Sequence, residues 1–315
     1  MRDHGGNLDA AMMRYGGDGW LDLSTGINPR AYPVPDLPSR AWTALPTRAE
    51  MAALSDAARA AVGTTATVVP MAGAQGAIQA LPRVVSGRSA RVLGPTYNEH
   101  AGALVGAGWE VAEMTEIGAL EGADLAVVVN PNNPDGRSCT PDALRALAAQ
   151  VATLVVDESF CDVAPELSLA KDMPSNAVIL RSFGKFFGLA GVRLGFALTA
   201  GPLAAKLQAE AGPWPVSGAA IEIGRRALSD TGWQAETRER LVRDAERLDR
   251  LAATAGWRLV GGTTLFRTYD AGHAAAAQDK LARGRVWSRI FPYSDGWIRL
   301  GLPDGDGWAQ LEAAL

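Results

Sequence analysis

The sequence has 315 residues, of which 48% are hydrophobic and 20% charged, with a formal net charge of −4 and a pI near 5.5. A chain of this length can bury a large core, and length alone predicts about two domains. The basic residues are dispersed, so the sequence lacks the positive footprint of a nucleic-acid-binding protein.

The cysteine content and the N-terminal segment indicate the cellular compartment that the sequence favours. Only Cys139 and Cys161 are present, which is too few for a disulfide framework and favours a reducing cytoplasm. The N-terminal segment is polar and has no apolar signal core, and no run of about 18 apolar residues follows it. We therefore expect neither export nor a membrane span.

The first 30 residues are expected to form two loops around one short helix. The first loop is HGGN at residues 4–7, and the second is LDLSTGINP at residues 21–29. Composition alone favours a flexible terminus for the first loop. However, its Gly-Gly pair exposes backbone N–H groups, and His4 and Asn7 add side-chain donors, so the loop could instead close over an anionic ligand.

Residues 31–48 are rich in proline and are expected to cross irregularly into a larger domain, with little helix before about Arg48. A helix is expected over Ala49–Val62. Beyond it, short apolar segments separated by helical ones predict an α/β domain whose mostly parallel sheet is covered on both faces. The expected strands are Thr67–Pro70, Arg91–Leu93, Trp109–Ala112, Leu125–Val129, Leu154–Val156, Val178–Leu180 and Leu194–Leu198.

Polar motifs follow several of these strands, and ligands of such sheets gather at strand ends. The turn AGAQG at residues 72–76 opens a helix whose free N–H groups suit a phosphate, although tight-turn geometry alone explains it equally well. Gly94-Pro95-Thr96-Tyr97 ends with a tyrosine that either stacks on an aromatic ring or fills the domain surface. The loop NPNNPDG at residues 130–136 ends a further strand.

Two ionisable groups lie in apolar surroundings. Asp157 ends a buried strand, where a carboxylate needs a partner such as a protonated ring nitrogen. Glu158 is the alternative, but strand alternation favours Asp157. Lys185 lies on a Gly-rich connection between buried strands, where a lysine loses its proton more easily and can become a nucleophile, although most loop lysines are solvated. Ser182 and Arg193 add donors suited to a phosphate.

Residues 201–315 change character and are expected to form a smaller α+β domain. Helices are expected over Ser217–Leu228 and Gln234–Ala255, the second with a solvated charged face. The expected strands are Trp257–Val260, Thr264–Arg267 and Trp297–Gly301.

Arg299 lies on the last strand, where a half-buried guanidinium needs either a structural salt bridge or an anionic ligand. The expected divisions are an arm and crossing segment over 1–47, partly packed with the small domain, a large domain over 48–205 and a small domain over 206–315.

No motif for another chemistry competes. The sequence has no Walker loop, no dinucleotide fingerprint and no Cys/His cluster with metal-ligand spacing, so no metal site is expected. The histidines are scattered, and His100 and His273 are expected to be ordinary polar residues.

The S-x-x-K and G-x-R-x-G elements around Lys185 resemble the Schiff-base segment of fold-type I pyridoxal phosphate (PLP) enzymes, the aspartate aminotransferase superfamily. The resemblance covers nearly the whole chain and implies the PLP-dependent transferase fold, a homodimer, and Lys185 as the covalent cofactor lysine. It also implies that Asp157 keeps the ring nitrogen protonated, which makes Lys185 and Asp157 the catalytic residues. The implied cofactor-binding residues are Gly73, Ala74, Gln75, Ser182 and Arg193 at the phosphate, Tyr97 stacked on the pyridine ring, Asn133 at the 3′-oxygen, Asp157 and Lys185.

The pairing of HGGN with L-x-L-S-x-G-I-N-P is similar to the threonine-phosphate decarboxylases of cobalamin synthesis. This resemblance implies substrate contacts near the N-terminus, while the superfamily implies an arginine for the substrate α-carboxylate. The implied substrate-binding residues are His4, Gly5 and Asn7 near the phosphate, Gly26, Ile27 and Asn28 beside the substrate, Arg289 at the phosphate and Arg299 at the α-carboxylate. Arg285 is an alternative to Arg289 for the substrate phosphate.

Two positions depart from the commoner superfamily pattern. Leu45 stands where many relatives place a tyrosine that reaches the cofactor phosphate of the neighbouring subunit. Phe160 stands where many aminotransferases have a tyrosine that donates to the 3′-oxygen, which phenylalanine cannot do. Phe160 therefore weakens an aminotransferase assignment, and the decarboxylases often have phenylalanine there.

The expected reaction is decarboxylation of L-threonine O-3-phosphate to aminopropanol phosphate. The alternatives are an aminotransferase of the histidinol-phosphate type and a non-catalytic PLP-fold protein that regulates or scaffolds a biosynthetic complex. The choice between the two enzymes depends on which bond at Cα is held perpendicular to the pyridine ring.

Overall fold

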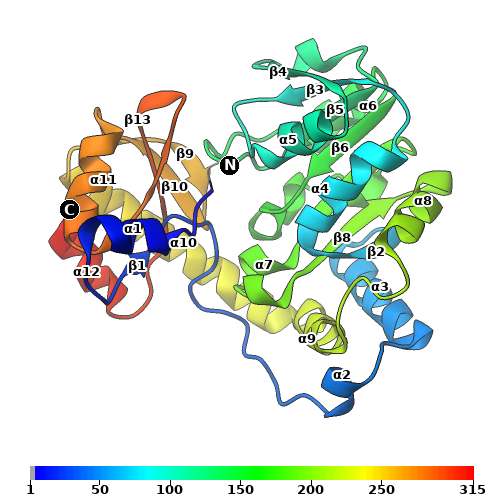
Figure 1. The fold of residues 1–315 in the computed structure, drawn as a ribbon, viewed down its shortest axis with the longest axis horizontal. Coiled ribbons are helices and arrows are strands. Elements are labelled where there is room, and N and C mark those ends of the chain that lie inside the picture. The colour runs from blue at the N-terminus through cyan, green and yellow to red at the C-terminus, as the bar shows by residue number, and fades with distance from the viewer. Residues whose placement is uncertain (1–3) are drawn as a thin grey trace. The chain divides into compact units, whose positions relative to one another are not determined.

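The computed structural model describes residues 4–315, and the chain divides into two compact units (Figure 1). The larger unit comprises Tyr32–Asn133 and Ser138–Gly232. The smaller comprises the chain up to Ala31, Pro134–Arg137 and Trp233–Leu315. These limits differ from the expected domain boundaries, because residues 32–47 and 206–232 cluster with the larger unit.

Packing of one late helix explains this difference. Helix α9 (Gly218–Ser229) packs against α2 (Arg40–Thr43) and α3 (Arg48–Val62). A Cβ added to Gly218 would lie 2.6 Å from the Ala41 carbonyl oxygen, so the two backbones approach closely. The crossing segment and α9 therefore belong to one packed layer of the larger unit.

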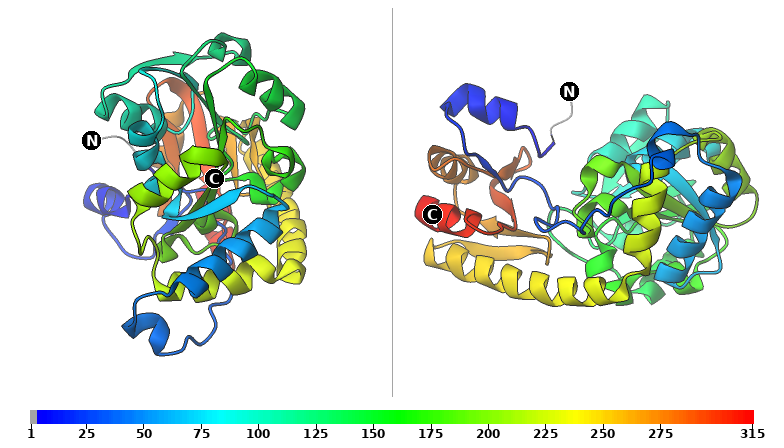
Figure 2. Two further views of the ribbon diagram at one scale, coloured as in Figure 1. Left: turned by 90° about the vertical axis from the view of Figure 1, so that its right-hand side faces the viewer. Right: turned by 90° about the horizontal axis from the view of Figure 1, so that it is seen from below.

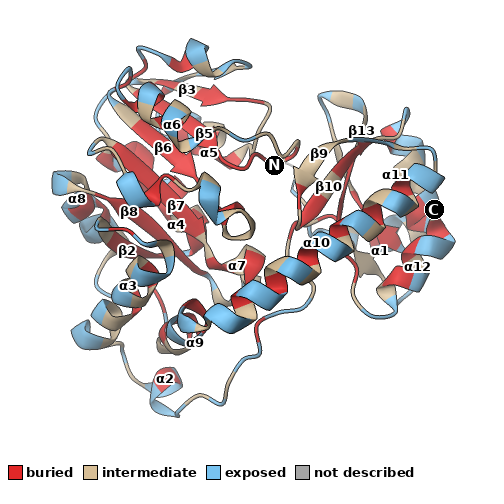
Figure 3. Ribbon diagram, turned by 180° about the vertical axis from the view of Figure 1, so that it is seen from behind, coloured by how far each residue is buried: buried red, intermediate tan, exposed pale blue. Residues whose placement is uncertain are grey.

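A seven-stranded sheet forms the centre of the larger unit, in the order β2-β8-β7-β6-β5-β3-β4. Strand β8 is antiparallel to β2 and β7, and the remaining pairs are parallel, which confirms the mostly parallel sheet. Every residue of β5 and β8 is buried, so helices cover both faces (Figure 3). The strands are β2 (Thr67–Ala72), β3 (Ser89–Leu93), β4 (Glu110–Met114), β5 (Leu125–Val129), β6 (Thr153–Asp157), β7 (Ala177–Ser182) and β8 (Leu194–Thr199).

Local signals set the helix ends of the larger unit. Helix α3 begins with a capping box between Thr47 and Glu50 and ends at Gly63, whose φ of 68° is left-handed. Residues of α4, α5 and α8 join the sheet in one apolar core. The other helices of this unit are α4 (Gly73–Val84), α5 (Glu99–Gly106), α6 (Pro141–Ala148), α7 (Phe183–Phe186) and α8 (Gly201–Ala211), with short 3-10 helices at Ile117–Leu120, Cys161–Val163, Pro165–Leu167, Ala170–Asp172 and Ala190–Val192.

The smaller unit contains an antiparallel sheet in the order β12-β13-β10-β9 and a parallel pair, β1 with β11. The expected strand Thr264–Arg267 is displaced, because Thr264 and Leu265 form a turn after Thr263 and β10 begins at Phe266. Figure 2 shows α10 as one long continuous helix. The elements are β1 (Leu21–Asp22), β9 (Arg258–Thr263), β10 (Phe266–Asp270), β11 (Val286–Trp287), β12 (Arg289–Phe291), β13 (Ser294–Gly301), α1 (Leu8–Tyr15), α10 (Thr231–Thr254), α11 (Ala274–Arg283) and α12 (Gly307–Ala314).

Among residues 4–315, no helix combines the length and the apolar character needed to cross a lipid bilayer.

Strand β8 approaches the start of α4 so closely that only glycine fits at position 195. A Cβ added to Gly195 would lie 2.4 Å from the Ala74 nitrogen and 2.9 Å from the Arg181 carbonyl oxygen. Because both are backbone atoms, Gly195→Ala should lower the free energy of unfolding by about 2 kcal/mol, measured by urea denaturation.

Gly106→Ala is the matched control for this prediction. Gly106 ends α5, and nothing lies within 4 Å of its added Cβ. Alanine there should preserve or slightly raise stability, since alanine favours helix more than glycine does. Equal stability of Gly195→Ala and the wild type would contradict the close contact between β8 and α4.

Candidate active site

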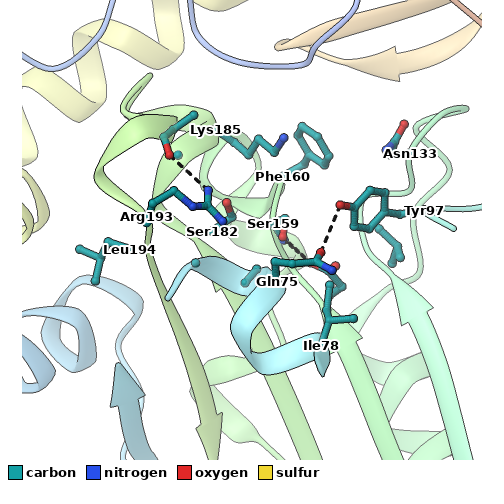
Figure 4. Close-up of a pocket in the computed structure, with 16 residues that line it drawn as sticks. Gln75, Ile78, Tyr97, Asn133, Ser159, Phe160, Ser182, Lys185, Arg193 and Leu194 are labelled. Carbon is teal, nitrogen blue, oxygen red and sulfur yellow. Dashed lines mark hydrogen bonds between the residues drawn. The ribbon is translucent and has the colours of Figure 1, made fainter. Parts of the chain in front are cut away.

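One pocket of the larger unit lies at the edge of the sheet where β5, β6 and β7 end and where β8 and α4 begin (Figure 4). It gathers all nine residues that the resemblance implied for the cofactor. These are Gly73, Ala74, Gln75, Tyr97, Asn133, Asp157, Ser182, Lys185 and Arg193; the pocket is also lined by Ile78, Val129, Ser159, Phe160, Gly184, Ala190 and Leu194.

A positively charged end of the pocket forms where Arg193 meets the first turn of α4. A Cβ added to Gly73 would lie 2.8 Å from Arg193 Nη2, so the guanidinium lies against the helix start. Arg193 itself has a left-handed φ of 55°, a strained conformation for a non-glycine residue. The first N–H groups of a helix lack intrahelical acceptors, and together with the guanidinium they suit a phosphate group.

A buried carboxylate, Asp157, ends β6 and lines the same pocket. Its Oδ2 lies 2.8 Å from His100 Nε2, and its Oδ1 accepts hydrogen bonds from the Ser159 nitrogen at 2.9 Å and from Ser159 Oγ at 2.5 Å. Burial alone would raise the pKa of Asp157, but the interactions with His100 and Ser159 outweigh burial and hold this pKa below its usual value. Asp157 is therefore ionised at neutral pH and suited to a protonated ring nitrogen.

The two histidines that were expected to be ordinary polar residues differ in role. His273 accepts a hydrogen bond from the Ala276 nitrogen and caps α11, as an ordinary polar residue can. His100 is 3% exposed and bound to Asp157, so it is a buried partner of the pocket carboxylate, which the sequence did not predict. The sequence signal that could have indicated a place near the pocket is the position of His100, three residues after Tyr97 on the helix that follows β3.

Glu158, the alternative to Asp157, is bound elsewhere. It is fully buried and accepts hydrogen bonds from Arg181 Nη1 at 2.8 Å, Ser168 Oγ at 2.6 Å and the Leu169 nitrogen at 2.8 Å. Glu158 is not among the residues that line the pocket. The alternation of side chains along β6 therefore directs Asp157, and not its neighbour, into the pocket.

Lys185 lies on α7, a single helical turn in place of the expected Gly-rich loop. Its side chain lines the pocket, and Nζ lies 5.5 Å from the centre of the Phe160 ring (Figure 4). The amine thus lies against an aromatic wall in the pocket that also contains the Arg193 guanidinium and the Asp157 carboxylate. A ligand with an anionic group, a basic ring nitrogen and an electrophilic carbon would meet a suitable partner for each.

Asn133 is held by the chain that follows it. Pro134–Arg137 belong to the smaller unit, where the Pro134 carbonyl oxygen accepts a hydrogen bond from Thr268 Oγ1 at 2.5 Å. A Cβ added to Gly136 would lie 2.1 Å from the Gly262 carbonyl oxygen. The NPNNPDG loop thus places Asn133 in the pocket, while Pro134 and Gly136 pack on β10 and β9.

Two arginines implied for the substrate are cross-strand neighbours in the smaller unit. Arg289 on β12 pairs in register with Arg299 on β13. Arg299 is 6% exposed, and burial, followed by the charge of Arg289, lowers its pKa to about 10. Because like charges on opposite strands repel, this pair favours an anion. Arg285 lies elsewhere: its guanidinium lies against Gly17, and Nη1 donates to the Asp18 carbonyl oxygen.

The HGGN loop is attached to the Arg299 surroundings through Ser24. The Ser24 carbonyl oxygen accepts a hydrogen bond from Arg299 Nη2 at 2.6 Å, and a Cβ added to Gly5 would lie 2.3 Å from the same oxygen. The Gly6 nitrogen donates to Ser24 Oγ at 2.7 Å. Gly5 is therefore needed for close approach, while His4 is exposed.

The other residues implied for the substrate also lie in the smaller unit. Asn7 Oδ1 caps α1 by accepting from the Ala10 nitrogen, and buried Asn28 Oδ1 accepts from Arg240 Nη2 at 2.7 Å. Gly26 is buried and Ile27 is half-buried. Both asparagine oxygens thus have structural roles that the motif alone did not predict.

The model of the family "Aminotransferase class I and II" matches residues 42–307. Threonine-phosphate decarboxylase of Pseudomonas aeruginosa is 44% identical over 328 residues, which cover 100% of this chain and 97% of that protein. The enzyme of the same name from Sinorhizobium sp is 40% identical and covers 99% of this chain and 97% of that protein.

Solved structures show the same fold. Histidinol-phosphate aminotransferase from Sinorhizobium meliloti, in complex with pyridoxal-5′-phosphate, has a TM-score of 0.84 at 21% identity and covers 98% of this chain and 92% of that one. L-threonine-O-3-phosphate decarboxylase from Porphyromonas gingivalis has a TM-score of 0.77 at 19% identity and covers 93% of this chain and 98% of that one. Since the family model spans most of the chain and the two relatives span nearly all of it, the chain belongs to the aminotransferase class I and II family.

Proposed function

We propose that the protein is a PLP-dependent carboxy-lyase, which converts L-threonine O-3-phosphate to (R)-1-amino-2-propanol O-phosphate and CO₂ in cobalamin biosynthesis. The observation that carries this proposal is the pair of full-length relatives, 44% and 40% identical, that are named threonine-phosphate decarboxylase. A relative named histidinol-phosphate aminotransferase is 33% identical over only 41% of the chain. The aminotransferase alternative is therefore the weaker one.

PLP fits the donor set of the pocket. Arg193 and the first turn of α4 suit its phosphate, and Asp157 suits its ring nitrogen. Lys185 supplies the primary amine that reacts with its aldehyde. When bound, PLP supplies an electron-accepting ring that weakens the bonds at the substrate Cα.

The residues of the pocket have separate roles in this proposal. Asp157 holds a proton at the ring nitrogen, and His100 and Ser159 hold the Asp157 carboxylate in place. Lys185 Nζ binds the cofactor before substrate arrives and afterwards carries a proton to Cα. Tyr97 supplies an aromatic face for the ring, and Ser182 and Asn133 add donors at the phosphate and the 3′-oxygen.

Substrate recognition is assigned to the smaller unit. We assign the α-carboxylate to Arg299 and the substrate phosphate to Arg289, because these cross-strand neighbours concentrate positive charge. His4, Gly5, Asn7, Gly26, Ile27 and Asn28 are assigned to the substrate surroundings. Arg299 and Gly5 meet at the Ser24 carbonyl oxygen, which supports a shared role for the two segments.

We also propose a homodimer. Trp42 on α2 is 69% exposed, and Leu45, three residues later, is 62% exposed and lines a pocket with Pro38, Pro46 and Ile221. Large apolar side chains gathered on one exposed segment suit an interface with a second copy.

A cytoplasmic location is part of the same proposal, supported by Cys139 and Cys161 remaining thiols.

The reaction is tested with the PLP-loaded protein and L-threonine O-3-phosphate. CO₂ and aminopropanol phosphate should form without a keto acid, and Lys185→Ala should lower kcat by about a thousandfold because it removes the proton carrier. Lys171→Ala, at an exposed lysine of the same unit, is the control and should keep full activity. Glutamate formation from 2-oxoglutarate without CO₂ release would contradict the decarboxylase.

The substrate role of Arg299 is tested by Arg299→Lys, which keeps the charge but loses the planar guanidinium. KM should rise roughly tenfold to a hundredfold, since charge-assisted hydrogen bonds to the substrate are lost, while the absorbance of bound PLP stays unchanged. Arg289→Lys should act in the same direction. Arg285→Lys is the control, and a larger effect there than at Arg289 would reverse the assignment.

Dimer formation is measured by analytical ultracentrifugation. The wild type should sediment as a dimer, and Trp42→Glu should shift it toward the monomer, because burying a charge in an apolar interface is unfavourable. Val105→Glu serves as the control, since Val105 is similarly exposed, at 61%, on α5. A monomeric wild type would refute the proposed assembly.

A further inference from the structure

Glu99 is a buried carboxylate that lies two residues after Tyr97. It is the first residue of α5, is 7% exposed, and accepts a hydrogen bond from Gln75 Nε2 at 2.7 Å. The other end of the same amide, Gln75 Oε1, accepts a hydrogen bond from the Tyr97 hydroxyl at 3.3 Å (Figure 4). Gln75 therefore connects Glu99 to an aromatic residue of the pocket wall.

The charge of Glu99 determines the order of donors and acceptors along this connection. An ionised carboxylate has only acceptors, so the –NH₂ end of the Gln75 amide must face it. The carbonyl end then faces Tyr97, and the Tyr97 hydroxyl must be the donor. Glu99 thus determines the direction of a hydroxyl that it does not itself contact.

The Tyr97 ring also lies near His100, which follows Glu99 in the first turn of α5. Its centre lies 6.2 Å from that of the His100 ring, with the planes at 83°, an edge-to-face arrangement. Glu99 and His100 are consecutive at the start of α5. Two consecutive residues of α5 therefore act on Tyr97. Glu99 positions its hydroxyl through Gln75, and His100, which also binds Asp157, lies edge-to-face with its ring.

We propose that Glu99 is a positioning residue, which acts through Gln75 to hold the Tyr97 ring in the orientation that contacts the cofactor ring. This inference rests on the proposed function, since it takes PLP as the ligand of the pocket. Without the charge at position 99 the Gln75 amide can invert. The Tyr97 hydroxyl then has no fixed acceptor, the ring gains freedom, and the cofactor binds more weakly.

The test is the dissociation constant of PLP, measured by titrating the cofactor-free protein and following the absorbance of the bound form. Glu99→Gln should raise this constant by about tenfold, as expected when a buried charged hydrogen bond loses its direction. Tyr97→Phe should also raise it. The double variant should bind PLP no more weakly than Tyr97→Phe alone, because Glu99 acts through the hydroxyl.

Glu110→Gln is the matched control, since it makes the same change at an exposed carboxylate of the same unit and should leave PLP binding unchanged. Gln75→Asn provides a second route to the same result, because its amide is one methylene shorter and cannot reach both Glu99 and Tyr97. It should weaken PLP binding even if Glu99→Gln impairs folding.

Three outcomes would overturn the inference. Unchanged PLP binding in Glu99→Gln or in Gln75→Asn would show that the connection does not act on the cofactor. Additive effects of Glu99→Gln and Tyr97→Phe would show that Glu99 acts by another route. A wild type that binds no PLP would overturn the proposed function as well, whereas normal wild-type binding with unaffected variants would overturn only the role of Glu99.

Discussion

The close approach of β8 to the first turn of α4 is the contact on which the rest of the candidate site depends. Gly195 and Gly73 lack the Cβ atoms that would otherwise overlap backbone atoms or the Arg193 guanidinium. Strand β8 is antiparallel to its neighbours, so it begins at the edge where the parallel strands end. Arg193, immediately before β8, therefore lies at the positive end of the α4 dipole.

Two consecutive carboxylates at the end of β6 show how strand geometry separates a functional group from a structural one. Asp157 lines the pocket, whereas Glu158 is bound to Arg181 behind it. Burial raises the pKa of Glu158 despite the nearby Arg181 charge. For Asp157, the partners His100 and Ser159 outweigh burial and lower the pKa. The carboxylate that lines the pocket is thus the one whose pKa is held low, while the other is bound by donors outside the pocket.

In the smaller unit, Ser24 connects the HGGN loop to Arg299 on β13, although these segments are far apart in the sequence. Ser24 binds Arg299 through its carbonyl oxygen and Gly6 through its hydroxyl, and Asp22 accepts from the Ser24 hydroxyl at 2.5 Å. The HGGN loop, β1 and β13 are therefore fixed together around a buried arginine. This arrangement explains why the glycine at position 5 cannot carry a side chain without displacing the chain beside Arg299.

The sequence by itself predicted the alternating fold, and its resemblance to fold-type I PLP enzymes implied nine of the residues that line the pocket. Both depend on local signals. Each is a short apolar strand followed by a glycine-rich or polar turn, and the ends of parallel strands meet at one edge of a sheet. Only the tertiary structure decided the roles of His100 and Glu99, whose partners are 57 and 24 residues away in the chain. It also decided the limits of the two units, because the packing of α9 on α3 joins segments that have no common pattern in the sequence.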